Sequence, residues 1–475
     1  MVKLFFRRWR PPALLFPILT RPQMLKKILG LIGLCLALTA CGQGGGGGST
    51  SSGGNGNTSS STAGSGTTTT TTTTPPPLTN FTTITIDGGP AALSVGPNGY
   101  TAANTPYVSV TLCAPASPAN CQTIDHVLVD TGSVGLRIFA SVINASLLGA
   151  LPLETDSASN PVGSCYGFVD GYIFGSVRQA NFQIGGETVA NMPFMAIADA
   201  GVFSTVPSSC SSGGGSNENS VQAFGANGVI GIGVTATDCG SACTGAGGFG
   251  AATYYDCPNT GCGAVIARIP SASAPFQQLP NPVAAMSVDN NGTIISLPAA
   301  PSTGQATMTG TLYFGIGTQT NNTLGSATVL TASPSASSAG VGFLTAIYNG
   351  VSLNESFLDS GSNVYFFVDR TIPTCTQSQL QGYYCPTSAE LLSPTLQGQN
   401  GATVSAAFTL NNAQTLASVN DAVLPGIGAN PNLVGILSAY PRSFDFGLPF
   451  FYGRNLYTAI EGRSAGGFTG PYFAY

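Results

Sequence analysis

The segment Phe357-Leu358-Asp359-Ser360-Gly361-Ser362 repeats the pattern of an earlier segment, Leu128-Val129-Asp130-Thr131-Gly132-Ser133. In each copy, two apolar residues lead into Asp, a hydroxyl residue, Gly and Ser. An apolar run that ends in small polar residues is typical of a β-strand that enters a tight turn. The repeat therefore predicts two similar halves, each of which presents one Asp at the end of a strand.

The residues before each copy also correspond. Before the first copy, Tyr107 to Leu112 alternates like a strand, and a Pro- and Asn-containing loop leads to the run His126–Val129. Before the second copy, Phe343 to Tyr348 is strand-like, and Asn349-Gly350 is a strong hairpin turn signal. We therefore expect a hairpin ahead of each Asp.

A further shared element follows each Asp at a comparable distance. It is Val229-Ile230-Gly231 in the first half and Asp445-Phe446-Gly447 in the second, where Asp445 breaks the apolar pattern. Because glycine has no Cβ, it allows two backbones to approach closely. Each element is thus expected to be a strand that supports one Asp turn from behind.

This duplicated pattern resembles the pepsin-like aspartic peptidases, in which each lobe contributes one Asp-Thr/Ser-Gly turn. The likeness covers most of residues 80–475, with Gly310–Gly315 similar to the opening of the second lobe and Leu448–Ile460 similar to the final strands. It implies an all-β, bilobal fold with a central cleft, an N-terminal lobe at 80–282 and a C-terminal lobe at 283–475. The chain also resembles an uncharacterised family of bacterial lipoproteins of unknown function, which implies no mechanism.

The resemblance implies that Asp130 and Asp359 form a catalytic dyad. Two carboxylates at hydrogen-bond distance share one proton, so one activates a water molecule while the other polarises the peptide carbonyl. Such a reaction needs no cofactor and no metal. Supporting roles, which are to brace the two turns and to bind the carboxylates, are implied for Thr131, Gly132, Ser133, Ser360, Gly361 and Ser362.

Tyr166 is the candidate for the flap tyrosine that closes over substrate, since Cys165–Gly175 resembles the family's flap hairpin. The alternative is an ordinary strand aromatic beside a disulfide. Two departures from the family pattern concern this region. Arg137 stands where an aromatic residue is usual after Leu136, and the flap is slightly shorter than usual.

The chain is poor in charge, and its charges are unevenly distributed. Only 7% of the 475 residues are charged, and all three lysines precede Cys41. After Cys41, seven arginines stand against nineteen acidic residues, a balance of −12. An acidic body of this kind argues against a nucleic-acid partner, which needs basic surface over the phosphates. Abundant Gly, Ser and Thr favour short strands and tight turns over helices.

The N-terminal region indicates export and a membrane anchor. Residues 1–40 are predicted to be a signal peptide, with Met24 as an alternative start. Leu38-Thr39-Ala40-Cys41-Gly42 resembles a bacterial lipobox, which implies lipidation of Cys41 in the cell envelope, facing the periplasm or exposed on the outer membrane. The alternative is an ordinary cleaved signal peptide. Residues 41–79 are then a flexible Gly/Ser/Thr-rich tether.

The exported part contains ten cysteines, an even number that predicts disulfides in an oxidising compartment. The close pairs Cys113/Cys121, Cys257/Cys262 and Cys375/Cys385 could each close a small loop. A zinc site is the alternative for the four cysteines at 239, 243, 257 and 262, but Gly-rich surroundings disfavour it. The insertion Thr235–Gly263, which carries these four, is expected to be a stapled surface loop. The alternative is that it rims the cleft or contacts a partner.

Three functions are compatible with this pattern. The first is an envelope endopeptidase acting on peptides or proteins, which the intact Asp pair favours. The second is a lipoprotein that binds peptide or glycan in the same cleft without turnover, which Arg137 and the altered flap favour. The third is a surface adhesin or structural lipoprotein, suggested by the low charge and the long tether. A Ser-His-Asp enzyme would have to use the single histidine, His126, which we predict to be structural in a buried strand.

Overall fold

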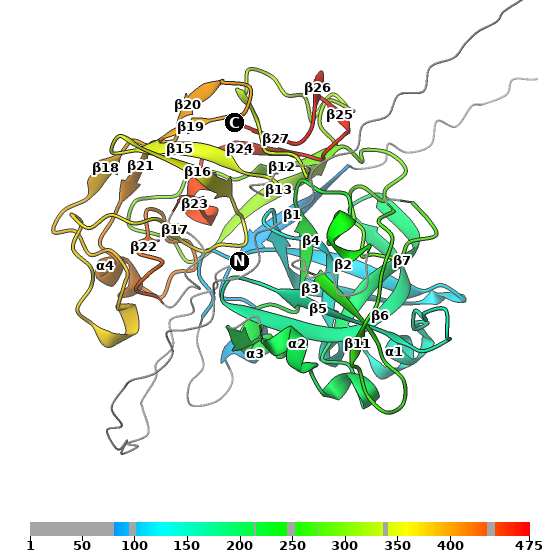
Figure 1. Cartoon of the computed structure of the whole chain (residues 1–475). Coiled ribbons are helices and arrows are strands. Elements are labelled where there is room, and N and C mark those ends of the chain that lie inside the picture. Colours follow the sequence, from blue (N-terminus) through cyan, green and yellow to red (C-terminus); the bar gives the residue numbers. More distant parts are fainter. Residues whose placement is uncertain are drawn as a thin grey trace, which may run out of the picture. The chain divides into compact units, whose positions relative to one another are not determined.

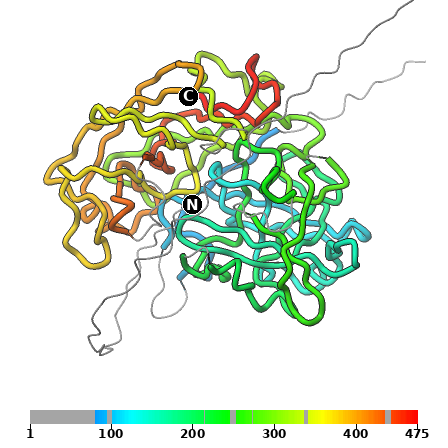
Figure 2. The backbone as a smooth tube through the Cα atoms, viewed as in Figure 1, coloured from blue at the N-terminus to red at the C-terminus, as the bar shows by residue number. Residues whose placement is uncertain are grey.

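The structure is a computed structural model that describes residues 80–94, 101–212, 215–244, 252–271, 273–335, 341–434 and 442–475. The predicted signal peptide, the lipidation site Cys41 and the tether at 41–79 lie outside these residues. Figure 2 traces the first half of the chain (80–282) from blue to green and the second half (283–475) from green to red.

Strands make up most of the regular structure, as the composition predicts (Figure 1). Those of the first half are β1 (Phe81–Ile86), β2 (Pro106–Ala114), β3 (Ser117–Asp130), β4 (Val134–Phe139), β5 (Val162–Gly167), β6 (Gly171–Ile184), β7 (Glu187–Ile197), β8 (Ser216–Asn217), β9 (Gly228–Ile232), β10 (Ala252–Asp256) and β11 (Ala264–Val265). Those of the second half are β12 (Gly292–Ser296), β13 (Met308–Phe314), β14 (Val329–Thr331), β15 (Leu344–Tyr348), β16 (Val351–Leu358), β17 (Tyr365–Phe366), β18 (Glu390–Leu392), β19 (Thr395–Gln397), β20 (Thr403–Ser405), β21 (Phe408–Leu410), β22 (Gly428–Ala429), β23 (Asp445–Phe446), β24 (Asn455–Ala459), β25 (Ser464–Ala465), β26 (Phe468–Thr469) and β27 (Tyr472–Ala474).

Helices are few and short. The α-helices are α1 (Ala145–Ala150), α2 (Ser208–Ser211), α3 (Val221–Phe224) and α4 (Ala413–Ala417). The 3-10 helices are η1 (Ala91–Ser94), η2 (Ala140–Val142), η3 (Gly201–Ser204), η4 (Gly240–Cys243), η5 (Ser378–Leu380) and η6 (Leu448–Phe451). Within the described ranges, no helix has the length and apolar character that crossing a membrane requires. The all-β prediction is therefore confirmed.

Two large sheets organise these strands. The larger has sixteen strands in the order β11-β10-β5-β6-β7-β4-β9-β3-β2-β1-β13-β12-β24-β27-β14, with β8 paired to β6. The smaller has seven, in the order β20-β19-β15-β16-β23-β17-β22. The larger sheet joins the two halves, because β1 pairs along its whole length with β13, from Phe81 opposite Tyr313 to Ile86 opposite Met308.

Each Asp of the repeat lies in the same local topology. In the first half, β9 runs parallel to β3 and antiparallel to β4, which places Gly231 opposite Asp130. In the second half, β23 runs parallel to β16 and antiparallel to β17, which places Phe446 opposite Leu358. The predicted supporting strands are thus confirmed in both halves, including the imperfect match that contains Asp445.

The hairpins ahead of the two Asp turns differ in detail. The second is as predicted, since Asn349 and Gly350 take positive φ angles of 50° and 77° between β15 and β16. In the first hairpin, the prediction of a Pro- and Asn-containing loop after Leu112 is wrong. Most of that segment is strand, and a disulfide joins Cys113 to the residue that it faces on β3, Cys121.

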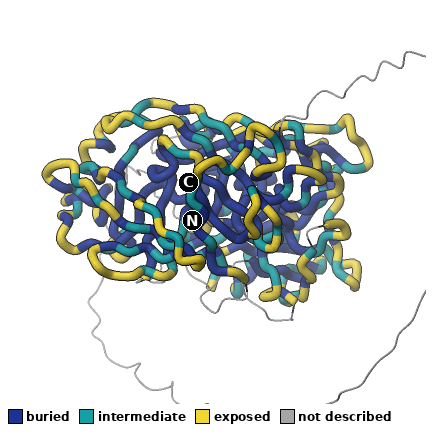
Figure 3. Tube along the Cα trace, turned by 90° about the horizontal axis from the view of Figure 1, so that it is seen from above, coloured by how far each residue is buried: buried dark blue, intermediate teal, exposed yellow. Residues whose placement is uncertain are grey.

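The apolar residues that precede the two Asp turns, and those of the two supporting strands, belong to one hydrophobic core. Figure 3 shows the buried interior of the chain. Val129 and Leu358, which precede the two Asp residues, are 0% and 1% exposed. Ile230 and Phe446 from the supporting strands are fully buried in the same cluster. Because these residues are packed against one another across the halves, the two turns that follow them are brought to a common point.

Candidate active site

Asp130 and Asp359 meet where the two halves join, as the repeat predicts. Both side chains are buried, and the two carboxyls interact directly, through their charges and a side-chain hydrogen bond. A Cβ added at Gly132 would lie 2.7 Å from Asp359 Oδ1. Glycine at this position therefore leaves the room that the carboxyl of the opposite half occupies.

Four hydrogen bonds between the halves lock the two turns together. The Thr131 N–H donates to Ser360 Oγ at 3.0 Å, and the Ser360 N–H donates to Thr131 Oγ1 at 2.9 Å. Thr131 Oγ1 then donates to the Leu358 carbonyl at 3.0 Å, and Ser360 Oγ to the Val129 carbonyl at 2.8 Å. Buried groups that are all paired hold a single geometry. This arrangement confirms the pepsin-like aspartic peptidase fold implied by the resemblance.

Each carboxyl is also bound within its own turn. The Gly132 N–H and the Gly361 N–H donate to the Oδ1 atom of the Asp two residues earlier, both at 2.8 Å. Ser133 and Ser362 contact the corresponding Oδ2 atoms through their hydroxyls, Ser362 at 2.8 Å. All six supporting residues therefore lie where the sequence places them.

The electrostatics of the pair suit a shared proton. Burial, followed by the negative charge of Asp359, raises the pKa of Asp130 to about 8. A carboxyl that holds its proton at neutral pH is able to act as an acid beside an ionised neighbour that acts as a base. The same two residues can thus supply both proton-transfer functions.

A cavity of about 280 Å³ opens beside Asp359. It is lined by the turn residues Thr131, Gly132 and Ser133, and by Tyr166. Its apolar wall consists of Val341, Phe343, Phe357, Phe366 and Phe473. A mostly apolar pocket with a few converging polar groups is the usual form of a site for a small molecule or a peptide side chain.

Tyr166 lies on the β5–β6 hairpin, where the sequence places the flap tyrosine, and its side chain lines the cavity. The neighbouring Cys165 forms a disulfide with Cys210, which ties this strand to α2. The ring of Phe168 packs against the Tyr166 ring with 5.0 Å between centroids. The hairpin is therefore anchored on both sides of the tyrosine.

Arg137, the departure from the family pattern, is fully buried under this tyrosine. Its guanidinium carbon lies 3.8 Å from the centroid of the Tyr166 ring, close enough for a cation–π interaction. Its Nη1 donates to the Val134 carbonyl at 2.6 Å, and its Nη2 pairs with Asp238 Oδ2 at 2.9 Å. The candidate flap residue Tyr166 thus has a cation as its ring partner, at the position where the family pattern has an aromatic residue.

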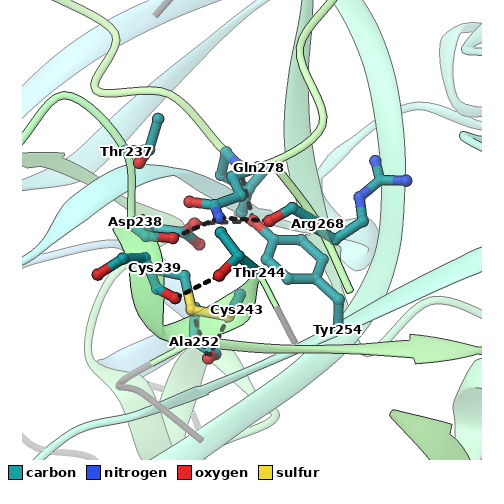
Figure 4. The surroundings of a disulfide bond; sticks show 12 residues. Thr237, Asp238, Cys239, Cys243, Thr244, Ala252, Tyr254, Arg268 and Gln278 are labelled. Atoms are coloured by element: carbon teal, nitrogen blue, oxygen red, sulfur yellow. Dashed lines mark hydrogen bonds between the residues drawn. A yellow bond between two sulfur atoms is a disulfide. The ribbon is translucent and has the colours of Figure 1, made fainter. Parts of the chain in front are cut away.

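Asp238 connects Arg137 to a second buried tyrosine. The Tyr254 hydroxyl donates to Asp238 Oδ1 at 2.8 Å and accepts from the Leu279 N–H at 2.6 Å. Figure 4 shows the side chains of Asp238 and Tyr254 beside the Cys239–Cys243 disulfide. Burial raises the pKa of Asp238 to about 6, although Arg137 acts in the opposite direction.

Within the insertion Thr235–Gly263, the segment Ala252–Asp256 is therefore not part of a surface loop, as we expected, but a strand. This strand, β10, pairs with Val162–Tyr166 of β5. Tyr254 and Tyr255 are both 0% exposed. The prediction was wrong because the two tyrosines continue the flap sheet and bury themselves against it, while only their Gly- and Cys-rich surroundings suggested a loop.

The ten cysteines of the described residues form five disulfides: Cys113–Cys121, Cys165–Cys210, Cys239–Cys243, Cys257–Cys262 and Cys375–Cys385. The three close pairs predicted from spacing are confirmed. The four cysteines considered as zinc ligands are divided between two of these disulfides, so their thiolates are not available to a metal.

His126 lies on β3 as predicted, but it is not buried. Its side chain is 23% exposed, and its Nε2 lies 3.3 Å from Asp87. The hydrogen bond to Asp87 raises the pKa of His126. Its backbone takes a positive φ of 47°, which turns the ring away from the alternation of the strand. Neither Asp87 nor Asp125, its two acidic partners, lines the cavity beside the dyad.

One residue of the site had no predicted role. Asp445, on β23, is 6% exposed and lies opposite Phe357. Its Oδ2 atom is 2.6 Å from Ser362 Oγ, which also binds Asp359. Burial, followed by the charge of Asp359, raises the pKa of Asp445 well above its usual range. The break in the apolar pattern was the only sequence signal for this third carboxyl.

Comparisons with known proteins assign a family. The model of a family described as "Protein of unknown function (DUF3443)" matches residues 77–475, and the chain belongs to that family. No curated protein matches the chain. Among solved structures, an aspartic proteinase from Irpex lacteus is similar at 15% identity, over 83% of this chain and 96% of that chain, with a TM-score of 0.41.

Proposed function

We propose that this member of the DUF3443 family is an aspartic endopeptidase of the bacterial cell envelope, held at the membrane through a lipidated Cys41. The observation that carries the proposal is the pair of buried, directly interacting carboxyls of Asp130 and Asp359, of which Asp359 lines a cavity. Each is bound by an N–H and a hydroxyl of its own turn, so their orientation is fixed before any substrate binds.

The chemistry follows from one proton shared between the two carboxyls. The ionised carboxyl takes a proton from a water molecule while the water oxygen attacks the peptide carbonyl carbon. The protonated carboxyl gives its proton to the carbonyl oxygen, which forms a tetrahedral diol. The diol then collapses as its C–N bond breaks and the leaving nitrogen receives a proton, and the pair again holds one proton.

The substrate class is suggested by the walls of the cavity. Phe343, Phe357 and Phe473 line the cavity together with Asp359, and Tyr166 lines it from the β5–β6 hairpin. These groups suit an apolar side chain of an extended peptide, whose carbonyl would then lie over the carboxyls. We therefore expect cleavage beside large apolar residues of unfolded proteins or peptides.

The second candidate is a lipoprotein that binds peptide or glycan without turnover. One observation favours it: Arg137 stacks on Tyr166 and pairs with Asp238, which is an unusual partner for a flap tyrosine. A flap held in this way could cover a ligand without completing the catalytic geometry.

Cleavage of an unfolded protein separates these candidates. The purified lipoprotein in detergent is incubated with the substrate from acidic to mildly alkaline pH, and products are identified by mass spectrometry. We expect cleavage that is inhibited by pepstatin and absent in Asp130→Asn and Asp359→Asn. Calorimetric binding of pepstatin without cleavage would support the binding protein. If pepstatin does not bind and no substrate is cleaved, the third alternative, an adhesin or structural lipoprotein, is supported.

A further inference from the structure

Ser362 lies between the carboxyls of Asp359 and Asp445, and its single hydroxyl hydrogen limits how these two acids can be protonated. Its Oγ atom is 2.8 Å from Asp359 Oδ2 and 2.6 Å from Asp445 Oδ2. A serine hydroxyl has one hydrogen and can donate it to only one of these oxygens. The other contact needs a hydrogen that comes from the carboxyl. One of the two acids at Ser362 must therefore be protonated.

The surroundings place that proton on Asp445. Ser362 is its hydrogen-bond partner, and its Oδ1 atom has no partner among the described residues although it is buried. Asp359, in contrast, also accepts the Gly361 N–H at 2.8 Å, which favours its charged form. A buried carboxylate with one unpaired oxygen costs far more than a neutral acid in the same place.

The charged groups that act on Asp445 favour the same assignment. The two carboxyls that influence it are Asp359 and Asp130, and both raise its pKa in addition to burial. The salt bridges between described residues do not include Asp445. Like charge without a compensating cation stabilises the neutral form of an acid.

We propose that Asp445 is a positioning residue of the dyad, a neutral acid whose carboxyl O–H donates a hydrogen bond to Ser362 Oγ. Ser362 must then donate to Asp359, which stabilises Asp359 as the ionised partner. This inference rests on the proposed function and gives the two catalytic carboxyls different roles. Asp359 takes the proton of the attacking water, and Asp130 holds the proton given to the carbonyl oxygen.

The direct test is infrared spectroscopy of the full chain at neutral pH, because a protonated carboxyl has its own C=O stretch. Asp445→Asn and Asp445→Leu are compared with wild type. The matched control is Asp289→Asn, a buried Asp that binds Thr318 and Gln319 and does not line the cavity. We expect both Asp445 variants to lose one protonated-carboxyl band that the control retains. An unchanged band in Asp445→Asn would overturn the inference, whether or not the chain cleaves peptides.

A pH profile of kcat/KM tests the positioning role itself. An Asn amide at 445 can still donate to Ser362, whereas a Leu side chain cannot. Asp445→Asn should therefore keep the acidic limb of the profile. Asp445→Leu should move it to higher pH by about one unit, since the hydrogen bond that stabilises ionised Asp359 becomes weaker. Identical profiles for the two variants would contradict the role.

Peptide cleavage tests the proposed function, and the infrared bands test the protonation of Asp445. If the wild type cleaves no peptide, the proposed function fails, and the infrared bands alone decide where the proton lies. If Asp445→Leu does not fold, Asp445→Asn still decides the infrared result, because it keeps the size and the hydrogen-bonding capacity of the acid.

Discussion

The two supporting strands occupy equivalent places but carry different chemistry. Val229 on β9 lies opposite Leu128, and Asp445 on β23 lies opposite Phe357, so the two residues correspond. Val229 is apolar and fully buried, whereas Asp445 brings a third carboxyl next to Ser362. The N–H donors, hydroxyls and inter-half hydrogen bonds are otherwise matched. A scaffold that is symmetric in its backbone is thus made chemically asymmetric by one side chain.

The largest expected effect concerns the part of the site that is symmetric. Asp130→Asn and Asp359→Asn should each lower kcat by roughly three to four orders of magnitude, because acid and base are both required. Initial rates of peptide cleavage measure this, with Asp289→Asn as the control that keeps wild-type rates. A variant of either Asp that retained a tenth of the rate would show that the halves do not act as a pair.

Substitution of Gly231 and Gly447 tests whether the backbone packs equally closely against the supporting strand in the two halves. A Cβ at Gly231 would lie 2.5 Å from the Val134 nitrogen, and one at Gly447 would lie 2.2 Å from the Val364 oxygen. Because these neighbours are backbone atoms, each Gly→Ala change should lower the free energy of unfolding by about 3 kcal/mol. Urea unfolding measures the change. Gly149→Ala, in a helix with open space around it, should be neutral or stabilising and serves as the control.

The hydrogen bonds between the halves should contribute nearly equally from each side. Thr131→Val and Ser360→Ala each remove one hydroxyl that both donates and accepts, at a cost of about 2 kcal/mol in unfolding free energy. Because the two hydroxyls act on each other's turn, the double variant should cost less than the sum. Strict additivity in the double-mutant cycle would mean that the turns are fixed independently.

The pH dependence of stability should reveal the asymmetry. The raised pKa values of Asp130, about 8, and of Asp445 lie above the unfolded value of about 3.9, so the folded state binds these protons more tightly. Their contribution to stability is full below pH of about 3.9 and is lost as pH rises through the folded pKa values.

Asp445→Asn should remove the part of the stability loss at rising pH that is due to deprotonation of Asp445. Within the window where only the folded state holds the proton, its unfolding free energy should fall less steeply than that of wild type, by about 1.4 kcal/mol per pH unit. Chemical unfolding over a series of pH values measures the slope. A slope equal to that of wild type would place an ionised carboxylate at 445.

Much of the site could be predicted from the chain, because it depends on a local repeat. The Asp turns, their glycines and hydroxyls, and the supporting strands all have short signatures. The support of Tyr166 could not be predicted, since Arg137 and Asp238 are 101 residues apart and meet only in the folded chain. The role of Asp445 was also beyond reach, because it depends on the register between β23 and β16 that points its carboxyl at Ser362.

The central claim, that Asp130 and Asp359 together bind the attacking water, is tested most directly by a crystal structure with a statine-containing peptide inhibitor. The statine hydroxyl imitates the attacking oxygen of the tetrahedral diol. We expect this hydroxyl within hydrogen-bond distance of both carboxyls, with Tyr166 over the bound peptide. An inhibitor seated elsewhere, or in contact with only one of the two carboxyls, would contradict it.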